Sequence, residues 1–127
     1  MKKMKVDLAV IGGGPAGMAA ALEAKRQGVE KVIIIERDKK LGGILQQCIH
    51  DGFGIQRFGE RLAGTEYAQR FIDQIKESDI EVLLETMVIE MTPEKEIYAC
   101  SGKHGMVYLT CGAIVAAMGC RERTASQ

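Results

Sequence analysis

The segment from residue 6 to residue 17 constrains the fold of this chain more than any other. Val6–Ile11 is apolar except for Asp7 and leads directly into three consecutive glycines. A near-continuous apolar run of this length is typical of a strand that is buried on both faces of a parallel sheet. Pro15 then occupies the first position of a helix, where its missing N–H costs nothing. The segment therefore predicts a buried strand, a tight turn and a helix in immediate succession.

The residues that follow predict the rest of a βαβ unit. Helix-forming residues, above all alanines, predict a helix over residues 16–27, and Gly28 supplies a left-handed stop. Lys31–Glu36 contains four consecutive β-branched residues and predicts a second buried strand. Because the connections are short, these elements predict two parallel strands joined by one helix.

Three glycines in the first turn, Gly12, Gly14 and Gly17, form the pattern GxGxxG. The first permits the tight turn, the second lets backbone approach a pyrophosphate, and the third lets the helix pack closely on the sheet. Glu36 lies 19 residues after Gly17, near the ~20 expected for a carboxylate that binds ribose hydroxyls. A carboxylate at this position would repel the 2′-phosphate of NADP, which argues against NADP at this site. The pattern predicts a dinucleotide site; the alternative is a glycine-rich turn without a ligand.

The remainder of the chain divides into a loop region and a half dominated by strands. From Arg37 to Gly64 no hydrophobic period is sustained, which predicts a long functional loop region. Thr65 is a candidate N-cap for a helix that ends near Ser78. A third parallel strand, an antiparallel meander and a last buried strand are predicted at Ile80–Leu84, Met87–Met91, Ile97–Ser101, Met106–Thr110 and Ala113–Ala117.

Composition argues against several classes of protein. Lys and Arg number 17 and Asp and Glu 17, so the chain has no net charge that would gather nucleic acid or an anionic membrane. The apolar stretch Ala113–Met118 is too short to span a bilayer, and the basic N-terminus lacks the apolar region of a signal peptide, so a cytoplasmic location is expected. The four cysteines show no zinc spacing and only two histidines occur, so no metal site is expected.

The glycine motif belongs to a wider pattern. Residues 11–17 read IGGGPAG, Glu36 and Arg37 end the second strand, and residues 41–43 read LGG. These motifs resemble the N-terminal FAD-binding segment of the pyridine nucleotide-disulphide oxidoreductase superfamily, where this glycine form with a later LGG is typical of FAD sites. Residues 113–119 resemble a second signature of that superfamily, although Met118 replaces its threonine.

The resemblance implies an α/β fold, namely a three-layer Rossmann-like FAD/NAD(P)-binding fold with a parallel sheet and a small antiparallel β-meander. It implies that residues 1–127 are the FAD-binding domain, expected to be the N-terminal fragment of a larger flavin-dependent, NAD(P)-linked oxidoreductase. FAD would bind through its ADP half at the first βαβ unit, and NAD(P)H would be the co-substrate of the complete enzyme. The alternatives are an NAD-binding dehydrogenase or sensor domain, and a noncatalytic subunit that retains the fold.

Two departures from the superfamily carry further expectations. Disulphide reductases place two cysteines four residues apart after the Gly-Gly, whereas only Cys48 lies there, so residues 42–54 resemble a branch without the redox dithiol. No second GxGxxG follows, so the chain alone is expected to be incomplete for catalysis. It would lack a C-terminal, NAD-binding part or a partner subunit. A sheet without its closing strand exposes an edge, so self-association is also expected.

The resemblance implies a set of site residues, for which plainer interpretations remain open. Arg37 would contact adenine or phosphate, or it is a solvated strand-end arginine. His50 and Cys48 are weak catalytic candidates near the flavin, or ordinary loop residues, so catalytic residues stay unassigned. The backbone at residues 87–88 would contact adenine, and residues 117–119 would close over the cofactor. The implied cofactor-binding residues are Gly12, Gly14, Pro15, Ala16, Gly17, Glu36, Arg37, Gly42, Gly43, Val88, Ala117, Met118 and Gly119.

Overall fold

A six-stranded sheet organises the chain in the computed structural model, which describes residues 1–42 and 58–117, without the side chains of 58–67. The strand order is β3-β2-β1-β6-β5-β4. The neighbours β3, β2, β1 and β6 run parallel, while β6, β5 and β4 form antiparallel pairs. The elements are β1 (Lys2–Ile11), α1 (Pro15–Arg26), β2 (Val32–Ile35), α3 (Phe58–Glu77), β3 (Glu81–Leu83), β4 (Thr86–Met91), β5 (Glu96–Ser101) and β6 (Gly105–Ala116).

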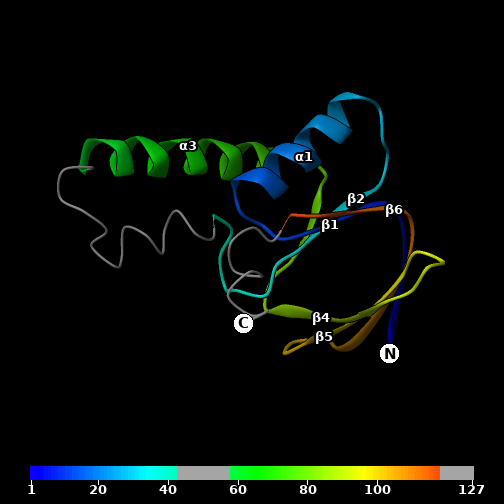
Figure 1. The fold of residues 1–127 in the computed structure, drawn as a ribbon. Helices are drawn as coiled ribbons and strands as arrows, with labels where there is room; N and C mark the ends of the chain where they lie inside the picture. Colours follow the sequence, from blue (N-terminus) through cyan, green and yellow to red (C-terminus); the bar gives the residue numbers. More distant parts are fainter. Residues whose placement is uncertain (43–57, 118–127) are drawn as a thin grey trace.

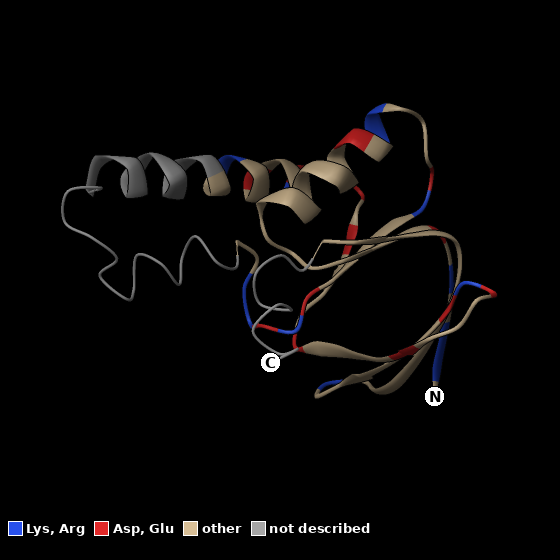
Figure 2. Ribbon diagram, viewed as in Figure 1, with Lys and Arg blue, Asp and Glu red and all other residues tan. Residues whose placement is uncertain are grey.

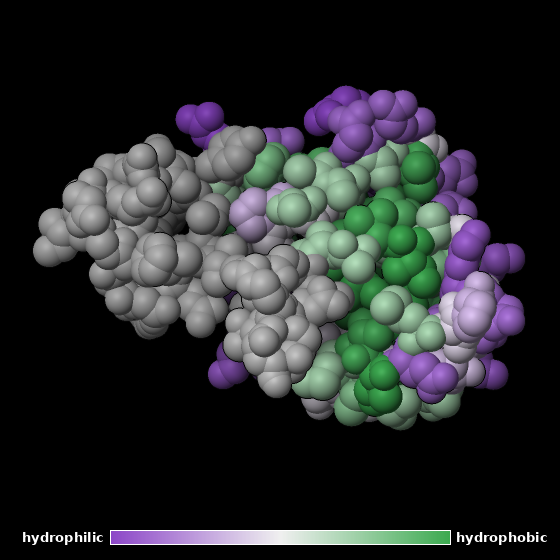
Figure 3. Space-filling view, in the orientation of Figure 1, coloured by the Kyte–Doolittle hydropathy of each residue, from purple (hydrophilic) through white to green (hydrophobic). Residues whose placement is uncertain are grey.

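The sheet separates two hydrophobic cores. Helices α1 and α3 cover one face, and the β4–β5 hairpin curls beneath the other (Figure 1). Alternate side chains of β2 lie on opposite faces of the sheet. Val32 and Ile34 pack beneath the helices, and Ile33 and Ile35 pack against the meander. Hydrophobic side chains fill the space between the upper strands and the hairpin (Figure 3). This three-layer arrangement confirms the α/β fold with a parallel sheet and a meander.

Two predicted boundaries are wrong. The helix predicted from Thr65 begins at Phe58, so Thr65 lies inside α3 and is not its N-cap. The strands predicted at residues 106–110 and 113–117 form one continuous strand, β6. Its first half pairs with β5, and its residues 107–116 pair with β1. A single strand therefore belongs to both the meander and the parallel sheet, which local hydrophobic patterns do not reveal.

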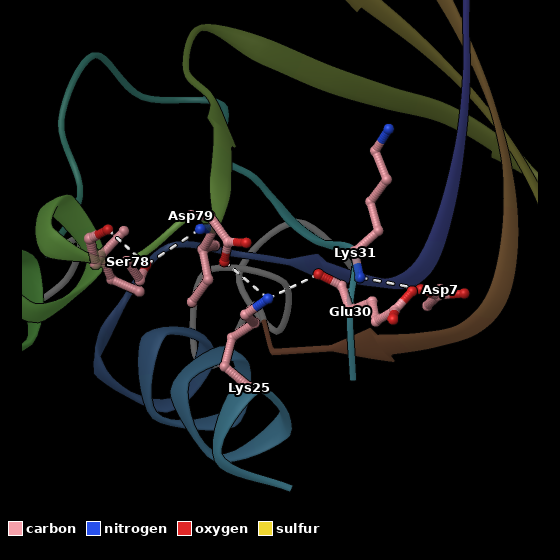
Figure 4. A network of polar contacts seen from close by, with 8 residues as sticks. Asp7, Lys25, Glu30, Lys31, Ser78 and Asp79 are labelled. Atoms are coloured by element: carbon pink, nitrogen blue, oxygen red, sulfur yellow. Dashed lines mark hydrogen bonds and ion pairs between the residues drawn. The ribbon is translucent and has the colours of Figure 1, made fainter. Parts of the chain in front are cut away.

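A polar network joins α1 to the amino ends of β2 and β3 (Figure 4). The Nζ atom of Lys25 lies 2.7 Å from Oδ1 of Asp79 and donates to the carbonyl oxygen of Glu30 at 2.7 Å. The hydrogen bond from Lys25 lowers the pKa of the exposed Asp79 carboxyl. The backbone N–H of Lys31 donates to Oδ2 of Asp7 at 2.9 Å. These contacts stabilise this end of the sheet, opposite the end where the glycine motif lies.

Replacing Lys95 by glycine is expected to stabilise the fold by about 0.5–1 kcal/mol, because a non-glycine residue in the left-handed region is strained. Lys95 has φ 64° and donates its backbone N–H to Thr92 O at 3.0 Å in the turn between β4 and β5. Urea unfolding measures the change. Glu94→Gly is the matched control, since Glu94 lies in the same turn without a positive φ. Equal destabilisation by both variants would contradict the strain at Lys95.

Candidate functional site

The turn after β1 is built by close backbone contacts of Gly12 and Gly17. Gly12 has φ 112° and donates its N–H to the carbonyl oxygen of Ile35 at 2.8 Å. A Cβ atom at Gly17 would lie 1.9 Å from the carbonyl oxygen of Gly12 and 3.3 Å from a methyl group of Val10. The first turn of α1 therefore rests directly on the end of β1. The fold itself requires glycine at residue 17.

The amino end of α1 opens away from the protein at Gly14. Gly14 is the N-cap of α1, Pro15 follows at the first helical position, and no side chain caps the helix. A Cβ atom at Gly14 would meet no heavy atom of the described residues within 4 Å. Unpaired N–H groups and the helix dipole make such an end favourable for an anion. Unlike Gly17, Gly14 is not required by contacts with the part of the chain that the structure describes.

Glu36 connects the end of β2 to the glycine turn. The carboxylate is buried, with only 4% of the residue exposed. Its Oε1 accepts the backbone N–H of Gly13 at 2.6 Å, and its Oε2 accepts the N–H of Asp38 at 2.8 Å. The carboxylate thus holds the turn after β1 against the turn after β2. The sequence predicts only a ligand contact for this residue, and no local sequence signal indicates its structural role.

The first two residues of the LGG motif reach the same place. Gly42 has φ 104° and donates its N–H to the carbonyl oxygen of Gly13 at 2.8 Å. A Cβ atom at Gly13 would lie 2.5 Å from Cδ2 of the buried Leu41 and 3.0 Å from Oε1 of Glu36. Gly13, which the GxGxxG pattern leaves unspecified, is therefore also constrained. Three motifs that are separate in the sequence form one cluster at the carboxyl ends of β1 and β2.

The other predicted site residues lie in different parts of the structure. Arg37 follows Glu36 and is exposed. Val88 lies in β4, and its side chain packs against the core between the sheet and the hairpin. Ala117 donates its backbone N–H to the carbonyl oxygen of Ile11 at 2.7 Å, so the end of β6 lies beside the glycine turn. The predicted residues outside the described ranges are Gly43, Cys48, His50, Met118 and Gly119.

Other chemistry-bearing groups in the described residues give no second site. The thiol of Cys111 is buried, and burial raises its pKa, which makes it unreactive. Within residues 1–42 and 58–117, no cluster of three His, Cys, Asp or Glu side chains is placed to hold a metal ion. In the same part of the chain, none of the helices is long and apolar enough to cross a membrane.

Comparison with known proteins identifies related sequences and folds. The family described as FAD dependent oxidoreductase matches residues 7–77. Hydrogen cyanide synthase subunit HcnB of Pseudomonas protegens is 29% identical over 124 residues, covering 95% of this chain and 26% of that protein. A thioredoxin reductase of Ureaplasma parvum is 35% identical over 86 residues, covering 67% of this chain and 26% of that protein. The chain thus spans about a quarter of these relatives.

A solved structure shows the same fold. The crystal structure of L-proline dehydrogenase from P. horikoshii matches with a TM-score of 0.73 and 26% identity, covering 93% of this chain and 23% of that one. A thioredoxin reductase from Streptococcus pyogenes matches with a TM-score of 0.62 and 16% identity, covering 91% and 32%. The second likeness, at this low identity, concerns the fold alone.

Proposed function

Because this chain belongs to the family of FAD-dependent oxidoreductases, we propose that its first βαβ unit binds the ADP half of FAD. The observation that carries this proposal is the space at Gly14, which is open among the described residues, at a helix end that none of their side chains caps. Gly12 is explained by its positive φ and Gly17 by packing, whereas no contact among the described residues explains the absence of a side chain at Gly14. A pyrophosphate at this position explains it, since the phosphate oxygens accept N–H bonds that the protein leaves unmade.

The other residues of the cluster suit the remainder of the ADP group. Glu36 lies at the carboxyl end of β2, where a carboxylate binds ribose hydroxyls in dinucleotide folds. Arg37 follows it in the sequence, is exposed, and would contact adenine or phosphate. Gly42 contacts the backbone of the glycine turn, and Ala117 lies beside the carboxyl end of β1. Together these residues would fix one end of the cofactor.

FAD, when bound, supplies the hydride-transfer chemistry of such an enzyme. The residues of this chain bind the dinucleotide and orient it, through the uncapped end of α1 and the anchored Glu36 carboxylate. His50 and Cys48 lie outside the described residues, so a role for them near the flavin stays a prediction from the sequence.

We further propose that residues 1–127 are the FAD-binding domain of a larger oxidoreductase linked to NAD(P)H. Support comes from the lengths of its relatives, of which this chain spans about a quarter. The additional polypeptide would supply the NAD-binding part, in the same chain or in a partner subunit. The relatives are named for different activities, so the substrate stays unassigned.

Calorimetric titration of the 127-residue protein with FAD, ADP and NAD tests the binding proposal. FAD is expected to bind more tightly than NAD, and ADP is expected to compete with FAD for the same site. A protein that prefers NAD would support the alternative of an NAD-binding domain. FAD binding that ADP does not displace would contradict the assignment of the ADP half to the first βαβ unit.

Glu36→Gln is expected to weaken ADP binding by about 1–3 kcal/mol, the range for a lost hydrogen bond to a charged group. The variant also loses charge at the carboxylate that accepts the N–H groups of Gly13 and Asp38, so its unfolding must be measured alongside. A thermodynamic cycle separates a lost ribose contact from a weakened glycine turn. It compares the wild-type protein and Glu36→Gln, each titrated with ADP and with 2′,3′-dideoxy-ADP. Removal of the ribose hydroxyls should cost affinity in the wild-type protein and little in the variant. An equal loss of affinity in the wild-type protein and the variant would show that Glu36 stabilises the turn and does not bind the ribose.

A further inference from the structure

A short loop that carries three cations leads from β2 back to the glycine turn. Arg37, Lys39 and Lys40 follow β2 and are exposed. Figure 2 shows these basic residues along the loop that leaves β2. The loop also contains the half-buried Asp38, so cations outnumber carboxylates in it by three to one. We call residues 37–40 the cationic loop.

Hydrogen bonds fix the cationic loop where it leaves β2. The N–H of Glu36 donates to the carbonyl oxygen of Leu83 at 2.8 Å, and the carbonyl oxygen of Glu36 accepts the N–H of Thr86 at 3.1 Å. The N–H of Asp38 donates to the Glu36 carboxylate, and the carbonyl oxygen of Asp38 accepts the N–H of Glu85 at 3.0 Å. The start of the loop is therefore tied to the connection between β3 and β4.

The chain is fixed again where it reaches the glycine turn. Gly42 donates its N–H to the carbonyl oxygen of Gly13, and the buried Leu41 side chain lies beside the same glycine. Lys40 is two residues from Gly42, a span of at most about 7 Å. Lysine side chains are long and flexible, so the ammonium groups of Lys39 and Lys40 can reach an anion that lies at the amino end of α1.

The first turn of α1 brings no cation of its own to such an anion. Residues 15–18 are uncharged, and the basic residues of α1, Lys25 and Arg26, lie in its last turn. In the described segments that follow β1, β2, β3 and β6, cations occur only in the cationic loop. The amino end of a helix corresponds to only about half an elementary charge, whereas each phosphate of a pyrophosphate bears a negative charge. The helix end alone would leave most of the ligand's charge uncompensated.

We propose that Lys39 and Lys40 neutralise the diphosphate of the bound ADP group, so that the cationic loop and the amino end of α1 act on the same anion. This inference rests on the proposed binding of ADP at the glycine turn and adds the residues that supply its positive charge. The fixed ends of the loop hold the two lysines between Glu36, on the ribose side, and Gly13, on the side of the glycine turn. Charge compensation by these side chains makes the affinity for ADP depend on salt.

Lys39→Gln/Lys40→Gln tests the inference, and Lys2→Gln/Lys3→Gln is the matched control. Each double variant removes two exposed cations from the chain. Lys3 lies near the amino end of β1, eight residues before Ile11. That span is about 26 Å of extended strand, well beyond the Debye length of about 10 Å at 0.1 M salt. Urea unfolding establishes that both variants keep the stability of the wild-type protein.

Calorimetric titration with ADP at low salt should show a roughly 2- to 30-fold loss of affinity in Lys39→Gln/Lys40→Gln, the range for two exposed charge pairs. The control should bind ADP as the wild-type protein does. The loss should disappear at about 1 M salt, where the Debye length falls to about 3 Å. Lys39→Arg/Lys40→Arg retains both charges and should restore the wild-type affinity. A variant whose loop is merely distorted would bind more weakly at every salt concentration.

The results that would overturn this inference differ from those that would overturn FAD binding. If the wild-type protein and Lys39→Gln/Lys40→Gln bind ADP equally well at low salt, the lysines do not act on the diphosphate, and the proposed FAD site stands. An equal loss in Lys2→Gln/Lys3→Gln would assign the effect to the net charge of the chain. A loss that persists at high salt, or that arginine does not restore, would assign it to the shape of the loop. A wild-type protein that binds neither ADP nor FAD would overturn the proposed function and this inference together.

Discussion

Gly14→Ala is expected to impair FAD binding while leaving the stability of the protein nearly unchanged. Across residues 1–42 and 58–117, the added methyl group meets no atom within 4 Å, so this part of the fold accommodates it. It projects from the helix N-cap, where the proposed pyrophosphate approaches the backbone. Steric overlap of this size costs about 1–3 kcal/mol, which corresponds to roughly a 5- to 150-fold loss of affinity. Calorimetry with FAD and with ADP measures the loss, and urea unfolding measures the stability.

Gly102→Ala provides the matched control for this experiment. Gly102 lies in the turn between β5 and β6, and a Cβ atom there would likewise meet no heavy atom of the described segments within 4 Å. The same chemical change far along the sequence from the glycine turn should alter neither FAD affinity nor stability. If Gly14→Ala binds FAD as tightly as Gly102→Ala does, the pyrophosphate does not lie at the amino end of α1.

Gly17→Ala is expected to produce the opposite pattern, namely a large loss of stability. Its methyl carbon would lie 1.9 Å from the carbonyl oxygen of Gly12 and 2.9 Å from the carbonyl carbon. These are backbone atoms, and the N–H of Gly12 is bonded to Ile35, so the turn cannot move aside without breaking its contact with β2. Overpacking against fixed atoms costs on the order of 3 kcal/mol, a large share of the roughly 5–15 kcal/mol that stabilises a domain.

Urea unfolding of Gly17→Ala measures this cost, and Gly14→Ala serves as its control three residues away. The unfolding midpoint should fall markedly for Gly17→Ala and stay close to the wild-type value for Gly14→Ala. Equal midpoints for Gly17→Ala and the wild-type protein would show that the helix can retreat from β1. The pair of variants thus separates the glycine required by the ligand from the glycine required by packing.

The strand predictions succeeded where burial on both faces leaves a clear pattern. Residues 32–35 are apolar and β-branched throughout, and β2 is buried on both sides of the sheet. The prediction failed at β6, where two separate strands were predicted and one continuous strand is found, with Gly112 between the two predicted ranges. A Cβ atom at Gly112 would lie 2.8 Å from the carbonyl oxygen of Asp7, so this glycine permits close approach of β6 to β1 within one strand.

The start of α3 was mispredicted for a related reason. Residues 58–64 contain two glycines and no sustained hydrophobic period, so local propensity favours a loop. The helix nevertheless begins at Phe58. Its second half is anchored by Ile72 and Ile75, which pack in the core beneath the helices. Helix formation is cooperative, so an anchored segment extends through residues that would not form a helix alone.

The sequence by itself determined the glycine turn, the βαβ unit and the acid that follows it, because strand burial, turn sterics and helix initiation act within a few residues. The tertiary structure alone decided which glycines the protein needs for its own packing, since Gly13 is constrained by Leu41 and by Glu36, 23 residues away. It also decided that one strand, β6, pairs with both β5 and β1, which joins the meander to the parallel sheet. Contacts between distant parts of the chain arise from the packing of whole elements, and no local pattern of residues encodes them.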